Sequence, residues 1–334
     1  MKLRLAILAA VGVALALYLV RYVGWHAVLH AAAAIGWGGF ALFCLCALAL
    51  FVLLGAAWRV LLRGTDAPPL WLLVRARLVR DAVAEVLPLS QLGGIALGVR
   101  AAILQGLAAP LAAASMVVDV TTEMLAQIAY AAGGLLILAA RVPRSERLAS
   151  LLSSCALGLV LALLAAAIFI ALQRRSAQIT ARFAGNMLRG AGTTLAGLST
   201  ALETIHRSPV RVALSAALHL VAWIGNGAAV WLGFRLIGAH VDVAAVIAIE
   251  SIVYAIRSAA PFIPNALGVQ EGAYLLLAPL FGLGTDTALA ISVLKRARDV
   301  AIGVPVLLLW QAAEGRHSLR RAAVGPRTRN GDAQ

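Results

Sequence analysis

The sequence predicts an all-α polytopic membrane protein with about six to eight transmembrane helices. Of its 334 residues, 62% are hydrophobic and only 13% are charged, and the mean hydropathy is +0.94. A soluble domain is about half apolar and about a quarter charged. One integral membrane domain is therefore expected over residues 1–315. A basic cytoplasmic tail follows over 316–334, and we expect it to be disordered beyond Ala323.

Six apolar runs approach or exceed the length of about 20 residues that crosses a bilayer as a helix. They cover about 5–23, 37–62, 109–140, 149–172, 209–238 and 285–313. The first run resembles a signal peptide, but no small-residue cleavage site precedes Arg21, so we expect an uncleaved span. A basic, mildly amphipathic segment separates the fourth run from the fifth, and we place it at the cytoplasmic surface.

The net charge of +14 is consistent with a membrane protein and does not by itself indicate nucleic-acid binding. Lys and Arg gather in cytoplasmic loops and meet anionic lipid headgroups. Their distribution predicts a bacterial inner-membrane protein with both termini in the cytoplasm, although the basic loop 141–147 then falls outside. We expect no nucleic-acid partner. The three cysteines lie in apolar runs without disulfide or metal-binding spacing, so no metal ion or cofactor is expected.

Proline and glycine interrupt two apolar segments, 86–106 and 261–284. Broken backbone at membrane depth is tolerated only where it is buried in protein or lines a cavity. Both segments are therefore predicted to be re-entrant. The residues assigned to the breaks are Pro88, Gly93, Pro261, Pro264 and Gly268. The segment before the first break, 68–86, carries too many charges for a lipid-facing span and is predicted to be an interfacial or a cavity-lining helix.

An internal repeat is indicated by three matches at one offset of 176 residues. Pro88 matches Pro264, and the pairs Gly106 and Gly282, and Arg59 and Arg235, recur at the same offset. The match predicts one unit over about 37–140 and a second over about 209–313. By the distribution of Lys and Arg, the two units enter the membrane from opposite faces. Such an inverted repeat is typical of transporters with a central site.

Ionisable residues occupy corresponding places in the two units. Asp119 and Glu123 lie one helical turn apart in the first unit, and Lys295 and Asp299 match them in the second, with Arg298 beside Lys295. Each set begins about 15 Å into its span, near the middle of the bilayer. Unpaired charge there costs several kcal/mol, so we expect the acidic residues of unit one to pair with the basic residues of unit two. A structural ion pair and a polar lining that handles a lipid headgroup or a proton both stay open.

The second broken segment carries a resemblance to a known family. The run PFIPNALGVQEGAYLLLAPLFGL, followed by ALAISVLKRARD, resembles the transmembrane region of lysylphosphatidylglycerol synthases and the free-standing flippase-like proteins related to them. The family pattern of a proline turn, a glycine, a glutamate and then a basic pair is matched by Pro264, Gly268, Glu271, Lys295 and Arg296. The length and short tail also resemble the subgroup found with hopanoid biosynthesis.

The first half matches the family through a proline, a glycine and a basic residue, here Pro88, Gly93 and Arg100. An acidic residue in the next span is matched by Asp119 or Glu123, whereas Gly94 stands where the family often has an acidic residue. The soluble aminoacyl-transfer domain of the full synthases is not expected. The resemblance thus implies the lipid-translocating half without the lysyl-transfer half.

The predicted function is an inner-membrane flippase or transporter for a polar-headed lipid, with membrane lipids as its partners. The predicted substrate-binding and translocation residues are Gln91, Arg100, Asp119, Glu123, Asn265, Gln270, Glu271, Lys295, Arg296, Arg298 and Asp299. One alternative is a non-catalytic assembly factor that binds enzymes of lipid, including hopanoid, biosynthesis. Another is a membrane enzyme acting on lipid-linked substrates, with Asp119 and Glu123 holding Mg²⁺. No phosphate-binding loop of the ATPase type occurs, so ATP hydrolysis is not expected. Because no aminoacyl-transfer domain is expected either, an enzyme is not the primary prediction.

Overall fold

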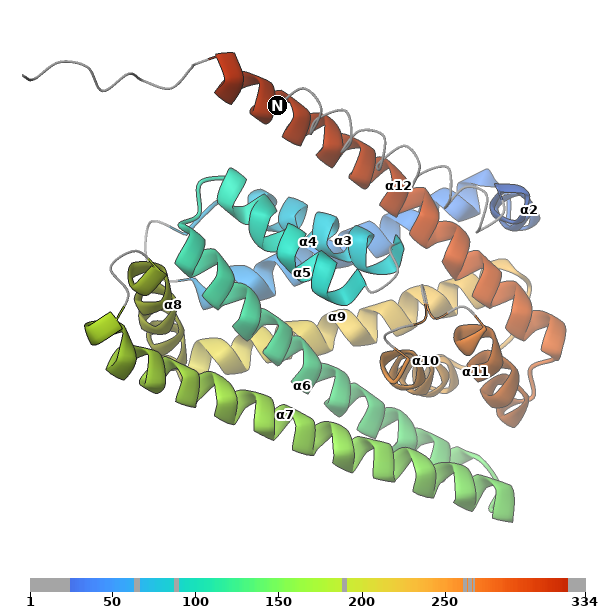
Figure 1. The fold of residues 1–334 in the computed structure, drawn as a ribbon. Helices are drawn as coiled ribbons and strands as arrows, with labels where there is room; N and C mark the ends of the chain where they lie inside the picture. Colours follow the sequence, from blue (N-terminus) through green and yellow to red (C-terminus); the bar gives the residue numbers. More distant parts are fainter. Residues whose placement is uncertain are drawn as a thin grey trace, which may run out of the picture.

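The described part of the chain is a helical bundle (Figure 1). The computed structural model describes residues 25–62, 67–86, 90–187, 191–260, 263, 266 and 268–323, and no strand occurs among them. Four helical stretches among these residues are long and apolar enough to cross a membrane: Trp37–Leu61, Ala109–Arg141, Leu148–Gln173 and Pro209–Leu236. The predicted all-α polytopic membrane fold is therefore confirmed. The first predicted span, 5–23, lies outside the described residues.

The helices fall into two halves with the same order of elements. The first half comprises α3 (Trp37–Leu61), α4 (Leu70–Val86), α5 (Ser90–Leu104) and α6 (Ala109–Arg141). The second half comprises α9 (Pro209–Leu236), α10 (Val243–Ser258), α11 (Val269–Leu277), the 3₁₀ helix η2 (Ala278–Phe281) and α12 (Thr285–Ala323). Helix α2 (Trp25–Ala34) precedes the first half, and α7 (Glu146–Met187) and α8 (Ala191–His206) connect the two halves.

The long helices α6 and α12 begin from the same local structure. Their first residues, Ala109 and Thr285, are separated by the offset of 176 residues that the sequence matches share. The turns after the preceding helices contain Gly106 and Gly282, whose positive φ angles of 99° and 76° favour glycine. In both cases the next amide, that of a leucine, donates to the carbonyl five residues before it at 3.1 Å, a pattern typical of helix C-termini.

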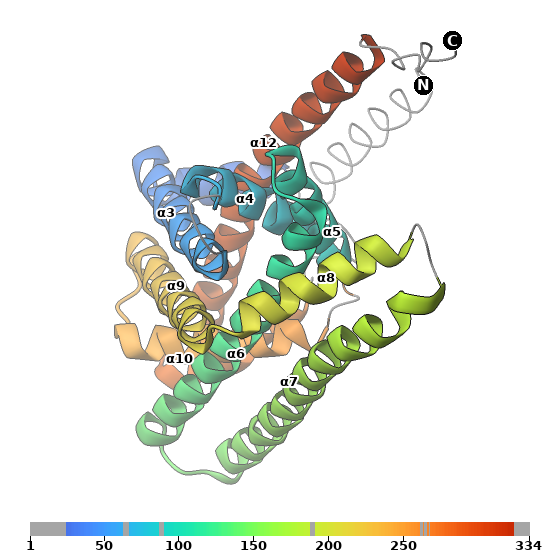
Figure 2. The ribbon, with the colours of Figure 1, turned by 90° about the vertical axis from the view of Figure 1, so that its left-hand side faces the viewer.

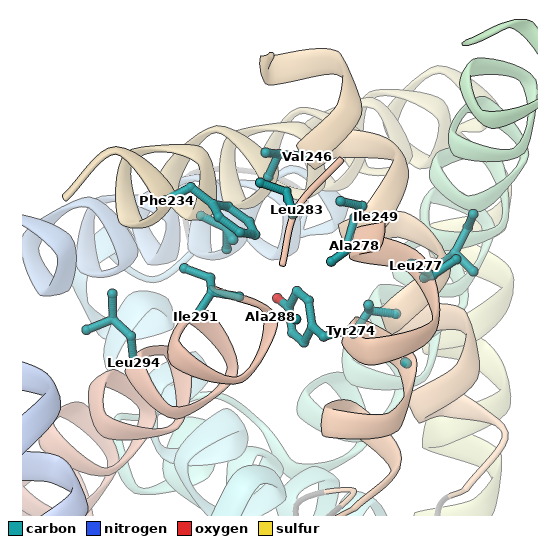
Figure 3. Packing of buried hydrophobic residues seen from close by; sticks show 14 of the residues in the cluster. Phe234, Val246, Ile249, Tyr274, Leu277, Ala278, Leu283, Ala288, Ile291 and Leu294 are labelled. Carbon is teal, nitrogen blue, oxygen red and sulfur yellow. The ribbon is translucent and has the colours of Figure 1, made fainter. Parts of the chain in front are cut away.

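The largest apolar core is shared by the two halves. Phe43 of α3 and Phe234 of α9 are both fully buried in it, and a second core surrounds Trp58 of α3. Figure 3 shows Phe234 and Tyr274 facing Ile291 where α9, α11 and α12 meet. Between the halves, α3 packs along α9, α4 along α12 and α6 along α10. The interface between the halves is therefore built from all the longer helices of both.

Helix α7 lies at the edge of the bundle (Figures 1 and 2). It packs mainly against α6 and α8, and only 6% of its most apolar window is buried. The exposed side includes Leu157, Leu161 and Phe169. In a bilayer this surface contacts lipid chains. Lipid chains are as apolar as these side chains, so the side chains need no further burial in protein.

The first broken segment differs from the expectation at Gly93. Gly93, predicted as a break, lies inside α5, where α4 and α5 pack side by side. Close helix packing depends on two other glycines of α5: a Cβ on Gly94 would stand 2.6 Å from the Arg80 carbonyl oxygen, and a Cβ on Gly98 would stand 2.8 Å from the Met116 methyl carbon. Residues 90–104 of the broken segment 86–106 form one helix, and its re-entry into the membrane stays a prediction. Helix α12 continues to Ala323, the residue beyond which the tail was expected to be disordered.

The last predicted span, 285–313, lies within α12 but is not among the four apolar helices. Its sequence carries Lys295, Arg296, Arg298 and Asp299 within little more than one turn. These charges lower the hydropathy of a helix that is otherwise long enough to cross a bilayer. The neighbours of α12 therefore have to satisfy its charges.

Candidate functional site

A cavity of about 480 Å³ lies between the two halves. Helices α3, α4 and α6 line it from the first half, and α9, α10 and α12 from the second. The charged residues that line it are Arg80, Asp81, Glu85, Glu123, Arg257, Arg298 and Asp299. Apolar side chains of α3, among them Leu50 and Phe51, complete the lining. A cavity with this many charges stands out in a chain in which only 13% of residues are charged.

The first buried charge network ties α4 to α6. Arg77 is only 1% exposed, and its Nη1 donates to the Asp119 Oδ2 at 2.7 Å. The same guanidinium donates to Asp81 at 3.0 Å and to Glu123. Arg80 donates from Nη2 to the Glu123 Oε2 at 2.7 Å. Two adjacent guanidinium groups therefore neutralise the carboxylates of α6.

This network continues into the second half through His219 of α9. Its Nε2 lies 3.0 Å from the second carboxylate oxygen of Asp119, and both side chains are fully buried. One helical turn from each, the hydroxyls of Thr122 and Ser215 lie 3.0 Å apart. Asp119 therefore accepts from both halves of the molecule at once.

The second buried network ties α10 to α12. Lys295 Nζ donates to the Glu250 Oε2 at 2.7 Å, and neither side chain is exposed. The Tyr274 hydroxyl donates to the other oxygen of Glu250. The Lys295 ammonium also lies 4.8 Å from the ring centroid of Tyr254, a favourable cation–π distance. The rings of Tyr254 and Tyr274 thus lie against the pair, and Tyr254 also lines the cavity.

The predicted pairing of Asp119 and Glu123 with Lys295 and Arg298 is wrong. Among the described contacts, the acids of α6 pair with the arginines of α4, and Lys295 of α12 pairs with an acid of α10. The physical reason is the reach of the Arg and Lys side chains: α4 packs on α12 and α10 packs on α6, yet the arginines of α4 extend to the acids of α6, and Lys295 of α12 extends to α10. The two networks have opposite polarity, since the long helix supplies the acid in the first half and the base in the second.

Two further ion pairs face the cavity, and one of them crosses between the halves. Arg257 of α10 donates to the Glu85 carboxylate of α4 at 2.7 Å, with exposed fractions of 9% and 34% for the two side chains. Arg298 donates from Nε and Nη2 to its neighbour Asp299 at 3.0 and 2.8 Å. All four side chains line the cavity. A molecule in the cavity can reach these pairs, as well as the lining pair of Arg80 and Glu123.

Of the predicted site residues, Glu123, Arg298 and Asp299 line the cavity. Asp119 and Lys295 are buried in the two networks and are not among the lining residues. The sequence analysis did not assign the residues that form ion pairs with or beside these: Arg77, Arg80, Glu85, Glu250 and Arg257. Their positions as charged residues in largely apolar stretches could have identified them as candidates.

The remaining predicted residues that the structure describes make contacts away from the cavity lining. Arg100 pairs with Glu314 at 2.9 Å, and Gln270 donates to the Ser292 hydroxyl at 2.9 Å. Glu271 accepts from the Gly268 amide at 2.9 Å and pairs with Arg296 at 2.5 Å, which fixes the start of α11. The following lie outside the described residues: the side chain of Gln91 and all of Asn265, Pro88, Pro261 and Pro264.

The bundle and its interior charges define a polytopic membrane protein with a charged cavity between two halves. The chain belongs to the family described as the lysylphosphatidylglycerol synthase TM region, whose model matches residues 3–306. The resemblance drawn from the broken segment is thereby confirmed. No curated protein and no solved structure matches the chain.

Proposed function

We propose that this protein translocates a polar-headed lipid across the membrane, with the headgroup passing through the cavity between its two halves. The observation that carries the proposal is a cavity of about 480 Å³ lined by seven charged side chains in an otherwise apolar bundle. Ligand sites commonly enclose about 300–1,000 Å³. Charges inside a membrane domain are costly, and they mark substrate or ion pathways.

The two classes of ion pair have different parts in this proposal. The sealed pairs, represented by Lys295 and Glu250, hold each long helix to its charged neighbour and keep their partners. The pairs at the cavity, Arg257 with Glu85 and Arg298 with Asp299, exchange one partner for the headgroup as it passes. Exchange keeps every charge compensated, and an uncompensated buried charge would be strongly unfavourable.

The relation between the halves supports access from either side of the membrane. Elements recur in the same order, with corresponding helices starting 172 to 179 residues apart, which supports an internal duplication. The Lys and Arg distribution favours opposite insertion of the two halves, with both termini in the cytoplasm of the bacterial inner membrane. In such an arrangement each half opens the cavity toward one face, as in transporters built from inverted repeats.

Translocation of a headgroup-labelled fluorescent lipid in proteoliposomes tests the proposal. A membrane-impermeant reductant bleaches the outer leaflet, and the remaining signal decays as lipid crosses. We expect Glu123→Gln and Arg298→Gln each to slow the decay about tenfold, which corresponds to losing about 1.4 kcal/mol at the barrier. Arg141→Gln, at an exposed pair away from the cavity, is the control and is expected to leave the rate unchanged. Wild-type decay no faster than that of protein-free vesicles would refute the proposal.

A further inference from the structure

Three hydrogen-bond donors at the cavity have no acceptor among the described residues. They are the indole Nε1 of Trp223 and the amide Nδ2 of Asn226, both on α9, and the Nη1 of Arg298 on α12. All three atoms are buried, and all three residues line the cavity. Buried donors are nearly always satisfied in folded proteins, so each of these needs a partner.

The surrounding side chains hold two of these donors in fixed orientations. The indole of Trp223 stacks on Tyr130 at 6.0 Å between ring centroids and meets Tyr254 edge-on at 4.7 Å. The other guanidinium nitrogens of Arg298 are bonded to Asp299, and its Cζ lies 5.1 Å from the ring centroid of Phe43. Only Nη1 is therefore left for a ligand. Donors oriented in advance bind an acceptor with little loss of conformational freedom.

The charge of the lining indicates what kind of acceptor fits. Three arginines face four carboxylates around the cavity, so the lining has no excess of positive charge. The donors therefore do not form a site for a free anion. They suit the oxygen atoms of a headgroup that need not carry net negative charge.

We infer that Trp223, Asn226 and Arg298 form a subsite that binds acceptor oxygens of the lipid headgroup, either phosphoryl oxygens or sugar hydroxyl oxygens. This inference rests on the proposed lipid function and adds the chemistry that the cavity recognises. Trp223 and Asn226 on α9 bind the headgroup from one side, and Arg298 on α12 binds it from the other. Because all three belong to the second half, this half carries the subsite and the first half supplies the facing carboxylates.

Native mass spectrometry of the full chain in a polyoxyethylene detergent tests the subsite. The protein is titrated separately with phosphatidylcholine, which offers phosphoryl oxygens without hydroxyls, and with monoglucosyl diacylglycerol, which offers hydroxyls without phosphate. Triacylglycerol, with neither group, gives the background. We expect Trp223→Phe and Asn226→Leu each to weaken retention of a single headgroup lipid about fivefold, because each removes one hydrogen bond. Asn226→Asp keeps the side-chain size, removes the donors and is expected to weaken retention further.

Trp231→Phe is the matched control, because its indole already donates to the Val241 carbonyl at 2.9 Å outside the cavity. Weaker retention of phosphatidylcholine alone assigns the subsite to a phosphoryl group, and weaker retention of the glucolipid alone assigns it to hydroxyls. Retention of both lipids that is unchanged in all three variants, in protein that keeps the wild-type melting temperature, overturns the inference. That result would leave the translocation assay unaffected, whereas a bound lipid without translocation would refute transport and keep the subsite.

Discussion

At the scale of single residues, burial separates two kinds of ion pair in this molecule. Lys295 and Glu250 are both 0% exposed, whereas Arg141 and Asp242 are each 51% exposed at a comparably short separation. Desolvation makes the buried pair costly to break, because removing one partner leaves a charge without compensation. Solvent screens the exposed pair, so its contribution is small.

Lys295→Met is expected to lower the free energy of unfolding by about 3–5 kcal/mol, because Glu250 is left buried with its charge uncompensated. Adding Glu250→Leu should restore most of this loss, since no buried charge then remains at the pair. Unfolding in mixed micelles of increasing denaturing-detergent content measures both variants. Arg141→Met is the control and should change the free energy by less than about 1 kcal/mol. A full-sized loss that persists in the double variant would show that the pair is not the cause.

The sequence identified the charged residues better than it identified their partners. Asp119 and Lys295 were expected at membrane depth, and both are fully buried. Their partners, Arg77 and Glu250, lie on neighbouring shorter helices. Which face such a helix turns toward the bundle depends on packing between elements distant in sequence, and no local pattern encodes it.

At the scale of elements, long apolar helices and the second interruption were predicted well. The bounds of α3 and α6 agree with the expected spans to within a residue, because an uninterrupted apolar run and a flanking proline or glycine define them. Helix α10 ends at Ser258 and the short α11 begins at Val269, whereas residues 90–104 of the first broken segment, 86–106, form one helix beside α4. Proline and glycine there indicated an interruption of the apolar run, but not that glycines inside α5 serve close packing.

The contact between α6 and α10 joins the two halves and depends on a glycine. A Cβ on Gly134 would stand 1.6 Å from the Ser251 hydroxyl oxygen and 2.8 Å from its Cβ. Gly134→Ala is therefore expected to destabilise the protein by about 1–3 kcal/mol through overpacking. Ser251→Gly in the same chain should recover most of the loss, because it removes both clashing atoms.

Thermal unfolding monitored by circular dichroism measures these variants. The adjacent Gly133 provides the matched control, because a Cβ there would meet nothing within 4 Å. Gly133→Ala should leave the melting temperature unchanged or raise it slightly, since alanine favours the helix. Equal destabilisation by the two alanine variants would contradict a role for the contact between the halves.

At the scale of the whole molecule, the halves cross so that each short charged helix also packs on the long helix of the other half. Helix α4 packs against α12 and α10 against α6, and the cavity lies between them. The family and the all-α membrane fold were predictable because composition and one local motif carry them. The position of the cavity was not predictable, because it depends on how the two halves dock.

The bond between Arg257 and Glu85 provides the most direct test of a headgroup passing between the halves. It joins α10 to α4 at 2.7 Å, and both residues line the cavity. Cysteines replace these two residues in a chain whose own Cys44, Cys46 and Cys155 are changed to serine. A bis-methanethiosulfonate crosslinker then joins the halves at this point, and a reductant releases them. Each single-cysteine variant treated with the same reagent is the control for the modification itself.

The measurement is lipid translocation in proteoliposomes before crosslinking, after crosslinking and after reduction. If the headgroup passes between the halves, translocation falls to the level of protein-free vesicles when they are joined and returns to its starting rate on reduction. A crosslinked protein that translocates lipid as fast as its reduced form would contradict this path.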